Sequence, residues 1–142
     1  MSFTTAAWST GGSIPKAYTC DGANTSPPLS IAGAPSRAVE LVLVVTNQNI
    51  SGESLWILAG IGPATTSIPQ GGVPTGAIQI VNTSGSARWN GPCPTPGPNT
   101  YEFALYALNT ASGLTPQSTR AQVETVIASA SSASVFTGTY KR

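Results

Sequence analysis

Glycine and proline interrupt this chain so often that long helices have little room. The sequence has 15 glycines and 12 prolines among 142 residues, and both residue types mark turns rather than the interior of helices. Closely spaced turn signals favour many short strands over long helices. A chain of this length forms one ordinary domain, which buries a core without obligatory metals or disulfides. We therefore expect a single β-rich domain over residues 1–142.

Five segments have the composition of strands. Val39–Val45 is rich in β-branched residues and almost continuously apolar, which is typical of a central strand covered on both faces. Leu55–Ala59 is predicted to be its partner, and Ala77–Val81 a shorter strand. Alternation along Tyr101–Leu108 predicts a half-buried strand. Val135–Tyr140 is expected to be the last strand.

One segment has the pattern of a helix. Thr115 is suited to capping its start, and Pro116 is suited to the first helical position. Apolar residues then recur on one face, at Val123, Val126, Ile127 and Ala130. A serine-rich stretch at 131–134 ends the pattern. The chain is thus predicted to be mainly β with one late helix.

The charge pattern excludes two classes of partner. Charged residues make up 8% of the chain, against about a quarter in typical soluble domains. Of the six basic residues only Lys141 and Arg142 are adjacent, so no basic stripe favours nucleic acid. Trp89 follows Arg88 and is expected to be core or a pocket wall. The longest apolar run, around Leu41–Val45, is far short of the roughly 20 residues of a membrane span.

The sequence gives little support for an enzymatic function because the chain has no histidine. Nucleophilic catalysis by serine or cysteine normally needs an adjacent base, most often histidine. Two cysteines without histidine make no recognisable zinc site. Asp21 is the most interesting carboxylate, but aspartate before glycine also stabilises turns, and no second acid is singled out to partner it. We expect no catalytic residue, no metal and no cofactor.

One loop and several landmarks resemble the phosphatidylethanolamine-binding protein family, which includes the Raf kinase inhibitor proteins and many bacterial homologues. The loop is Gly91–Tyr101, with the sequence Gly-Pro-Cys-Pro-Thr-Pro-Gly-Pro-Asn-Thr-Tyr. The family's landmarks precede it in order: Ile14-Pro15, Tyr18–Gly22, Asn24–Leu29, Trp56 and Trp89. The resemblance implies an antiparallel β-sandwich with a peripheral C-terminal helix.

The resemblance also implies a ligand pocket whose ionisable residues are missing here. Relatives commonly carry Asp-Pro-Asp where this chain has Thr46-Asn47-Gln48, and histidines where it has Leu55 and Asn99. A protonated histidine donates from both ring nitrogens, whereas leucine donates nothing and asparagine brings no charge. Charge-assisted hydrogen bonds are roughly twice as strong as neutral ones, so weakened anion binding is expected. The pocket positions implied by the resemblance are Asp21, Thr46, Leu55, Cys93, Pro94 and Asn99.

These positions favour a non-enzymatic protein that binds a small neutral or weakly anionic ligand. The alternative is a protein-binding inhibitor or structural protein without a small-molecule ligand, as the family's kinase and protease inhibitors suggest. A second copy of the chain is one candidate partner.

The two cysteines bear on the compartment. The resemblance places both Cys20 and Cys93 near the pocket, where they are either a disulfide or two buried thiols. A bridge closing so long a loop stabilises by about 4 kcal/mol on the chain-entropy model. With the low charge, a bridge would favour an extracellular or cell-envelope location. Met1-Ser2-Phe3 lacks the basic start and apolar stretch of a signal peptide, so a cytoplasmic location is the alternative.

Overall fold

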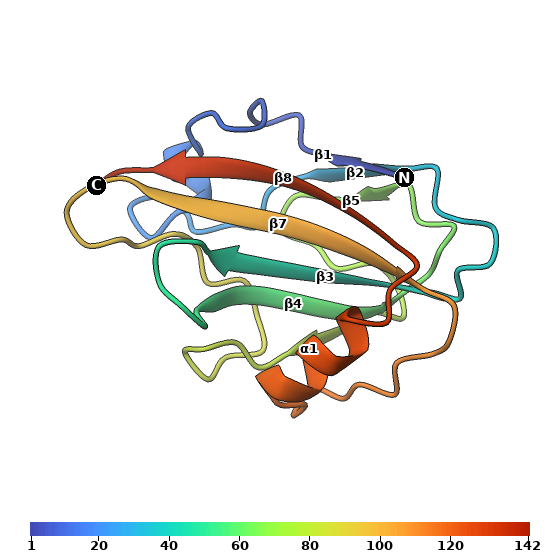
Figure 1. The fold of residues 1–142 in the computed structure, drawn as a ribbon. Helices are drawn as coiled ribbons and strands as arrows, with labels where there is room; N and C mark the ends of the chain where they lie inside the picture. Colours follow the sequence, from blue (N-terminus) through green and yellow to red (C-terminus); the bar gives the residue numbers. More distant parts are fainter.

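The computed structural model describes all of Met1–Arg142 and contains two antiparallel sheets (Figure 1). The smaller sheet has the order β1 (Ser2–Thr4), β2 (Leu29–Ala32) and β5 (Ser67–Ile68). The larger has the order β6 (Ile78–Ile80), β4 (Ser54–Ile61), β3 (Glu40–Asn47), β7 (Asn99–Leu108) and β8 (Ser132–Tyr140). A 3-10 turn, η1 (Lys16–Tyr18), and one α-helix, α1 (Arg120–Ile127), complete the elements. The predicted mainly β sandwich is confirmed.

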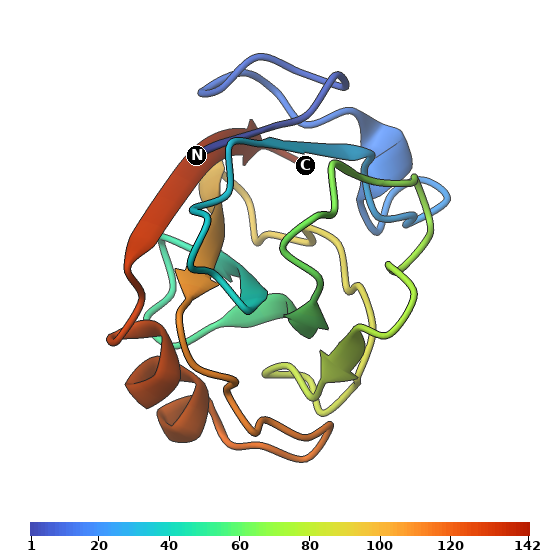
Figure 2. The same cartoon turned by 90° about the vertical axis from the view of Figure 1, so that its right-hand side faces the viewer.

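Strand β3 lies at the centre of the larger sheet because both of its faces are apolar. Leu41, Leu43 and Val45 belong to the core between the two sheets. Val42 and Val44 belong to a second, smaller core together with Val123 of α1. Figure 2 shows the two layers from the end, with the N-terminal segment at the top and α1 at the opposite side. The near-continuous apolarity of this strand is thus the consequence of two cores, as predicted.

Strand β7 shows the expected alternation. Tyr101, Phe103 and Leu105 are at most 1% exposed and face the core between the sheets. On the other face Glu102 and Tyr106 are only partly covered. The strand pairs with β3 over Tyr101–Leu108 and with β8 over Asn99–Ala107. It therefore carries the loop before it, residues 91–98, to the edge of the main core.

The predicted start of the helix is wrong. Ser118 forms a turn with Thr115: its amide donates to the Thr115 carbonyl at 3.0 Å, and its hydroxyl accepts from the Thr115 amide at 2.8 Å. The helix instead begins after Thr119, whose hydroxyl accepts from Gln122 N at 3.2 Å while Gln122 Oε1 accepts from Thr119 N at 2.8 Å. This reciprocal capping box satisfies two amides that would otherwise lack partners. The helix ends at Ile127, so Ala130 lies beyond it. Neither this helix nor the 3-10 turn has the length and apolarity that a membrane crossing requires.

Candidate functional site

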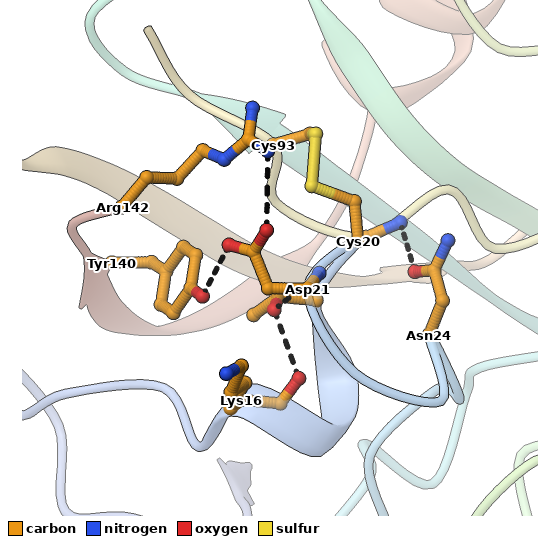
Figure 3. The surroundings of a disulfide bond; sticks show 9 residues. Lys16, Cys20, Asp21, Asn24, Cys93, Tyr140 and Arg142 are labelled. Carbon is orange, nitrogen blue, oxygen red and sulfur yellow. Dashed lines mark hydrogen bonds and ion pairs between the residues drawn. A yellow bond between two sulfur atoms is a disulfide. The ribbon is translucent and has the colours of Figure 1, made fainter. Parts of the chain in front are cut away.

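A disulfide joins Cys20 to Cys93 and ties the N-terminal part of the chain to the loop before β7 (Figure 3). The two Cα atoms are 5.4 Å apart, and 73 positions separate the residues in sequence. Two hydrogen bonds reinforce the connection: Cys20 N donates to Pro92 O at 3.1 Å, and Gly91 N donates to Asn24 Oδ1 at 2.9 Å. Of the two alternatives for the cysteines, the bridge is therefore confirmed. Neither sulfur is free to act as a thiolate nucleophile.

A cavity of about 500 Å³ lies beside this bridge. Its walls are the disulfide, residues 50–55, residues 83–84 and residues 90–91, and we call it the disulfide cavity. Leu55 supplies an apolar wall, and Glu53 is the only ionisable side chain in the lining. No lysine or arginine lines it, and the chain has no histidine. The disulfide cavity is therefore polar but carries no positive charge.

A hydrogen-bond network around Asn82 holds the polar wall in place. The side chain of Asn82 is buried, and its Nδ2 donates to Leu55 O at 2.9 Å and to Arg88 O at 3.1 Å. Its Oδ1 accepts from the Ser84 hydroxyl at 2.7 Å, and that hydroxyl accepts from Asn90 Nδ2 at 3.0 Å. On the same wall Ser54 N donates to the Thr83 hydroxyl oxygen at 2.7 Å. The wall thus presents neutral hydroxyl and amide groups in rigid positions.

The structure brings together only some of the predicted site residues. Leu55, Cys20 and Cys93 line the disulfide cavity. Thr46 does not: it lies on β3 opposite Ser54, and its hydroxyl oxygen accepts from Gln48 Nε2 at 2.8 Å.

Pro94, Asn99 and Asp21 also lie outside the lining of the disulfide cavity. Pro94 lines another hollow together with Cys93 and Arg142. Asn99 begins β7 and approaches Tyr101. Asp21 lies in a cluster with the C-terminal residues.

Tyr101 was assigned to the strand but not to a site, and its hydroxyl is unusual. The hydroxyl is buried, and the Asn99 side chain lies near it without the geometry of a hydrogen bond. Burial, together with the nearby Glu53 carboxylate, raises the pKa of Tyr101 to about 12, although the Asn99 side chain opposes part of the shift. The hydroxyl therefore stays protonated and remains a donor throughout the physiological range. The only sequence signal for it was its position two residues after Asn99 in the loop and strand segment.

Asp21 is held by the C-terminal end of the chain rather than by the cavity. The Tyr140 hydroxyl donates to Asp21 Oδ2 at 2.6 Å, and Arg142 Nη2 donates to Asp21 Oδ1 at 3.1 Å (Figure 3). The hydrogen bond from Tyr140 is the main cause that holds the pKa of Asp21 below its ordinary value, and Arg142 adds to it. Both contacts stabilise the ionised carboxylate. Asp21 therefore anchors the end of β8 to the turn that contains Cys20.

Replacing Tyr140 with phenylalanine is expected to raise the pKa of Asp21 toward that of an ordinary aspartate. The lowered pKa stabilises the folded chain at pH values above the unfolded-state pKa of aspartate, and this contribution is lost as the pH falls through the folded-state pKa. The variant should therefore lose less stability on acidification than the wild-type protein. A carboxyl-detected NMR titration measures the pKa, with Tyr106→Phe as the control. An unchanged pKa in Tyr140→Phe would contradict the assignment.

Comparisons with a family profile and with individual proteins agree on one family. The profile of the family described as phosphatidylethanolamine-binding protein matches residues 4–141. The chain is 37% identical over 130 residues to a UPF0098 protein of Methanothermobacter thermautotrophicus, covering 87% of this chain and 86% of that protein. It is 39% identical over 126 residues to LppC of Mycobacterium tuberculosis, designated a lipoprotein; the match covers 86% of this chain but 62% of LppC.

Two solved structures share the fold. One is CT736 from Chlamydia trachomatis, designated a phosphatidylethanolamine-binding protein homologue, with a TM-score of 0.92, 29% identity, and coverage of 99% of this chain and 97% of that one. The other is YbcL of E. coli, described as a member of the mammalian family, with a TM-score of 0.91, 28% identity, and coverage of 99% and 98%. The order of sequence landmarks, the two antiparallel sheets and the profile match over almost the whole length agree. The chain belongs to the phosphatidylethanolamine-binding protein family.

Proposed function

We propose that this protein is a non-enzymatic binding protein that takes a small neutral ligand in the disulfide cavity. The observation that supports this most is the charge of the lining, which contains one carboxylate, Glu53, and no cation. An anion entering the cavity meets a like charge and gains no charge-assisted hydrogen bond. A ligand with hydroxyl or amide groups instead finds neutral donors and acceptors on one wall and Leu55 on another. A weakly anionic ligand is less favoured by this lining than a neutral one.

The same lining supports a binding role rather than catalysis. Both cysteine sulfurs are in the disulfide, so no thiolate is available. Glu53 has no histidine or lysine beside it in the lining to share a proton. General acid and base chemistry usually needs a positioned pair of groups with separated pKa values, and the lining supplies one acid alone. We therefore assign the cavity to recognition.

We further propose that the protein works in the cell envelope or outside the cell. Disulfides persist in oxidising compartments and are rare in the cytosol, and this chain contains one. A relative, LppC, is designated a lipoprotein. The low content of charged residues, 8%, agrees with the same setting.

Thermal unfolding with a panel of small ligands tests the proposal. In Gln79→Glu, a change outside the disulfide cavity that removes the anion binding proposed below for a second cavity, we expect a saturable rise in Tm with a neutral polyol or alcohol and none with phosphate or phosphoethanolamine. A ligand at a hundred times its dissociation constant stabilises by about 2.7 kcal/mol, which is readily detected. A response to phosphate alone would reject the neutral-ligand proposal, and no response to any compound would reject small-ligand binding.

A designed variant tests the electrostatic reason. In Leu55→His combined with Glu53→Gln, a donor replaces the apolar wall and the like charge is removed. Added to Gln79→Glu, these two changes should produce a phosphate-dependent rise in Tm near pH 6, where histidine is protonated. Glu102→Gln removes one negative charge from β7, outside the cavity, and serves as the matched control. Failure of the double variant to respond would show that the charge of the lining is not what excludes anions.

A further inference from the structure

A second cavity of about 320 Å³ includes Trp89 in its walls, which share no residue with the disulfide cavity. Trp56 and Trp89 form part of the lining, with their rings 5.5 Å apart in an edge-to-face arrangement. Residues 24–26, the turn at 71–73, Gln79 and Arg88 form the rest. We call it the tryptophan cavity. Trp89, predicted to be core or a pocket wall, is both.

The acceptor oxygens of the two amide side chains in this cavity are already engaged. Gln79 Oε1 accepts from the Trp56 indole nitrogen at 2.8 Å, and Asn24 Oδ1 accepts from Gly91 N at 2.9 Å. An indole N–H and a backbone N–H can only donate. Each amide must therefore direct its oxygen at that partner. Its NH₂ group then has no hydrogen-bond partner within the protein. The orientation of both amides follows from this chemistry.

Apart from the hydroxyls of Thr25 and Ser26, which both donate and accept, the side-chain groups of the lining that have no protein partner are donors. Neither Gln79 Nε2 nor Asn24 Nδ2 makes a hydrogen bond within the protein, and the exposed Arg88 side chain forms no ion pair. The indole N–H of Trp89 is buried and also has no partner. Native proteins rarely leave a buried donor unpaired without a ligand, an ion or a water to satisfy it. No aspartate or glutamate lines the cavity to supply an acceptor.

From this we infer that the tryptophan cavity binds a small oxyanion, a carboxylate or a phosphate, through Arg88 and the free amide groups of Gln79 and Asn24. A guanidinium donates to an oxyanion in a planar, charge-assisted arrangement that a neutral ligand cannot match. The backbone of Arg88 is held beside the cavity, because its carbonyl accepts from the buried Asn82 amide at 3.1 Å, while its exposed side chain is free to reach a ligand. The volume of the cavity is sufficient for a small carboxylate or a phosphate. The two cavities therefore have opposite electrostatic character, one with a carboxylate and one with a guanidinium.

The three tryptophans of the chain provide the readout. Each indole N–H gives one signal in a proton–nitrogen NMR spectrum, and the Trp89 signal is assigned as the one missing in Trp89→Phe. Acetate, benzoate and inorganic phosphate are titrated at constant ionic strength against chloride. We expect a saturable shift of the Trp89 signal, with the carboxylates and phosphate as separate arms that identify the oxyanion. Absence of a saturable shift with all three would overturn the inference.

Two variants and a control make the test specific. Arg88→Gln should weaken binding about tenfold, as the loss of one charge-assisted hydrogen bond implies. Gln79→Glu keeps an oxygen for the Trp56 indole but puts a carboxylate where the amide donor was, so it should abolish binding. Arg37→Gln removes the same charge from an exposed site outside the cavity and should leave binding unchanged. Equal affinity in Arg88→Gln and Arg37→Gln would assign the shift to bulk charge and reject the site. Glu53→Gln tests the disulfide cavity alone, so the two proposals can fail separately.

Discussion

Replacing Cys20 and Cys93 together with serine is expected to lower the free energy of unfolding by about 4 kcal/mol. The bridge spans 73 positions, and without it the unfolded chain regains the entropy of an open loop of that length. In a domain of this size the loss corresponds to a fall in Tm of roughly 10–15 °C. The change is measured by urea and thermal unfolding of both proteins, the wild type in its oxidised form.

The same variant separates the stability of the fold from the shape of the site. The segments around Cys20 and Cys93 keep the hydrogen bonds from Cys20 N to Pro92 O and from Gly91 N to Asn24 Oδ1. We therefore expect the double-serine variant to fold, with the disulfide cavity loosened because two of its lining residues are no longer joined. Reduction of the wild-type protein with dithiothreitol should reproduce the lower Tm. Equal stability of the oxidised wild type and the variant would contradict this account.

Replacing Glu40 with glutamine is expected to destabilise the fold by about 2 kcal/mol, the cost of one buried amide left without an acceptor. Glu40 is only 7% exposed. Its carboxylate accepts three hydrogen bonds of 2.8 Å, from Gly60 N, from Ser112 N and from the Ser112 hydroxyl. Glutamine has one oxygen, so its NH₂ group must face one of the two backbone N–H donors. The carboxylate thus connects β3 to β4 and to the segment before α1. Urea unfolding measures the change.

Glu124→Gln is the matched control for Glu40→Gln. Its side chain is 58% exposed and forms an ion pair of 3.2 Å with Arg120 on the surface of α1. Such pairs are worth about 0.3–0.5 kcal/mol, so this variant should be nearly as stable as the wild-type protein. If Glu40→Gln were no less stable than Glu124→Gln, the three hydrogen bonds would have no net stabilising role.

Elements with a long local pattern could be predicted from the sequence. Val39–Val45 is apolar at almost every position, and the structure has β3 over Glu40–Asn47. Tyr101–Leu108 alternates, and the structure has β7 over Asn99–Leu108. A strand of this length carries its own signal because each buried face repeats every second residue.

The three strands of the smaller sheet could not be predicted because they contain too few residues to show a period, whereas the short β6 lies within the longer run Ala77–Val81, which was predicted. Strands β1, β2 and β5 have two to four residues each, and none of them was predicted. Their hydrogen bonds come from distant partners, such as Ser2 with Ala32. The predicted start of the helix was wrong for a related reason. Both Thr115 and Thr119 are able to cap a helix, and because Thr115 is engaged in a turn with Ser118, the helix begins after Thr119.

The site residues also fall into two groups, those with a signal in the sequence and those without one. The resemblance placed Leu55 and both cysteines near a pocket, and the structure shows them around one cavity. Glu53, which sets the charge of that cavity, gave no signal because its position depends on the turn between β3 and β4. The contact partners of Asp21 lie 119 and 121 residues away in sequence.

The kinds of side chain available are a property of the sequence: no histidine, few charges, two cysteines, and long apolar strands with turns between them. From these the β-rich class and the family could be argued, and the absence of histidine from any pocket follows directly. Which groups meet is a property of the packed sheets, since hydrogen bonds and electrostatic contacts act over a few ångströms in space regardless of sequence distance. The packing alone joined Cys20 to Cys93 and put Glu53 at one cavity and Arg88 at the other.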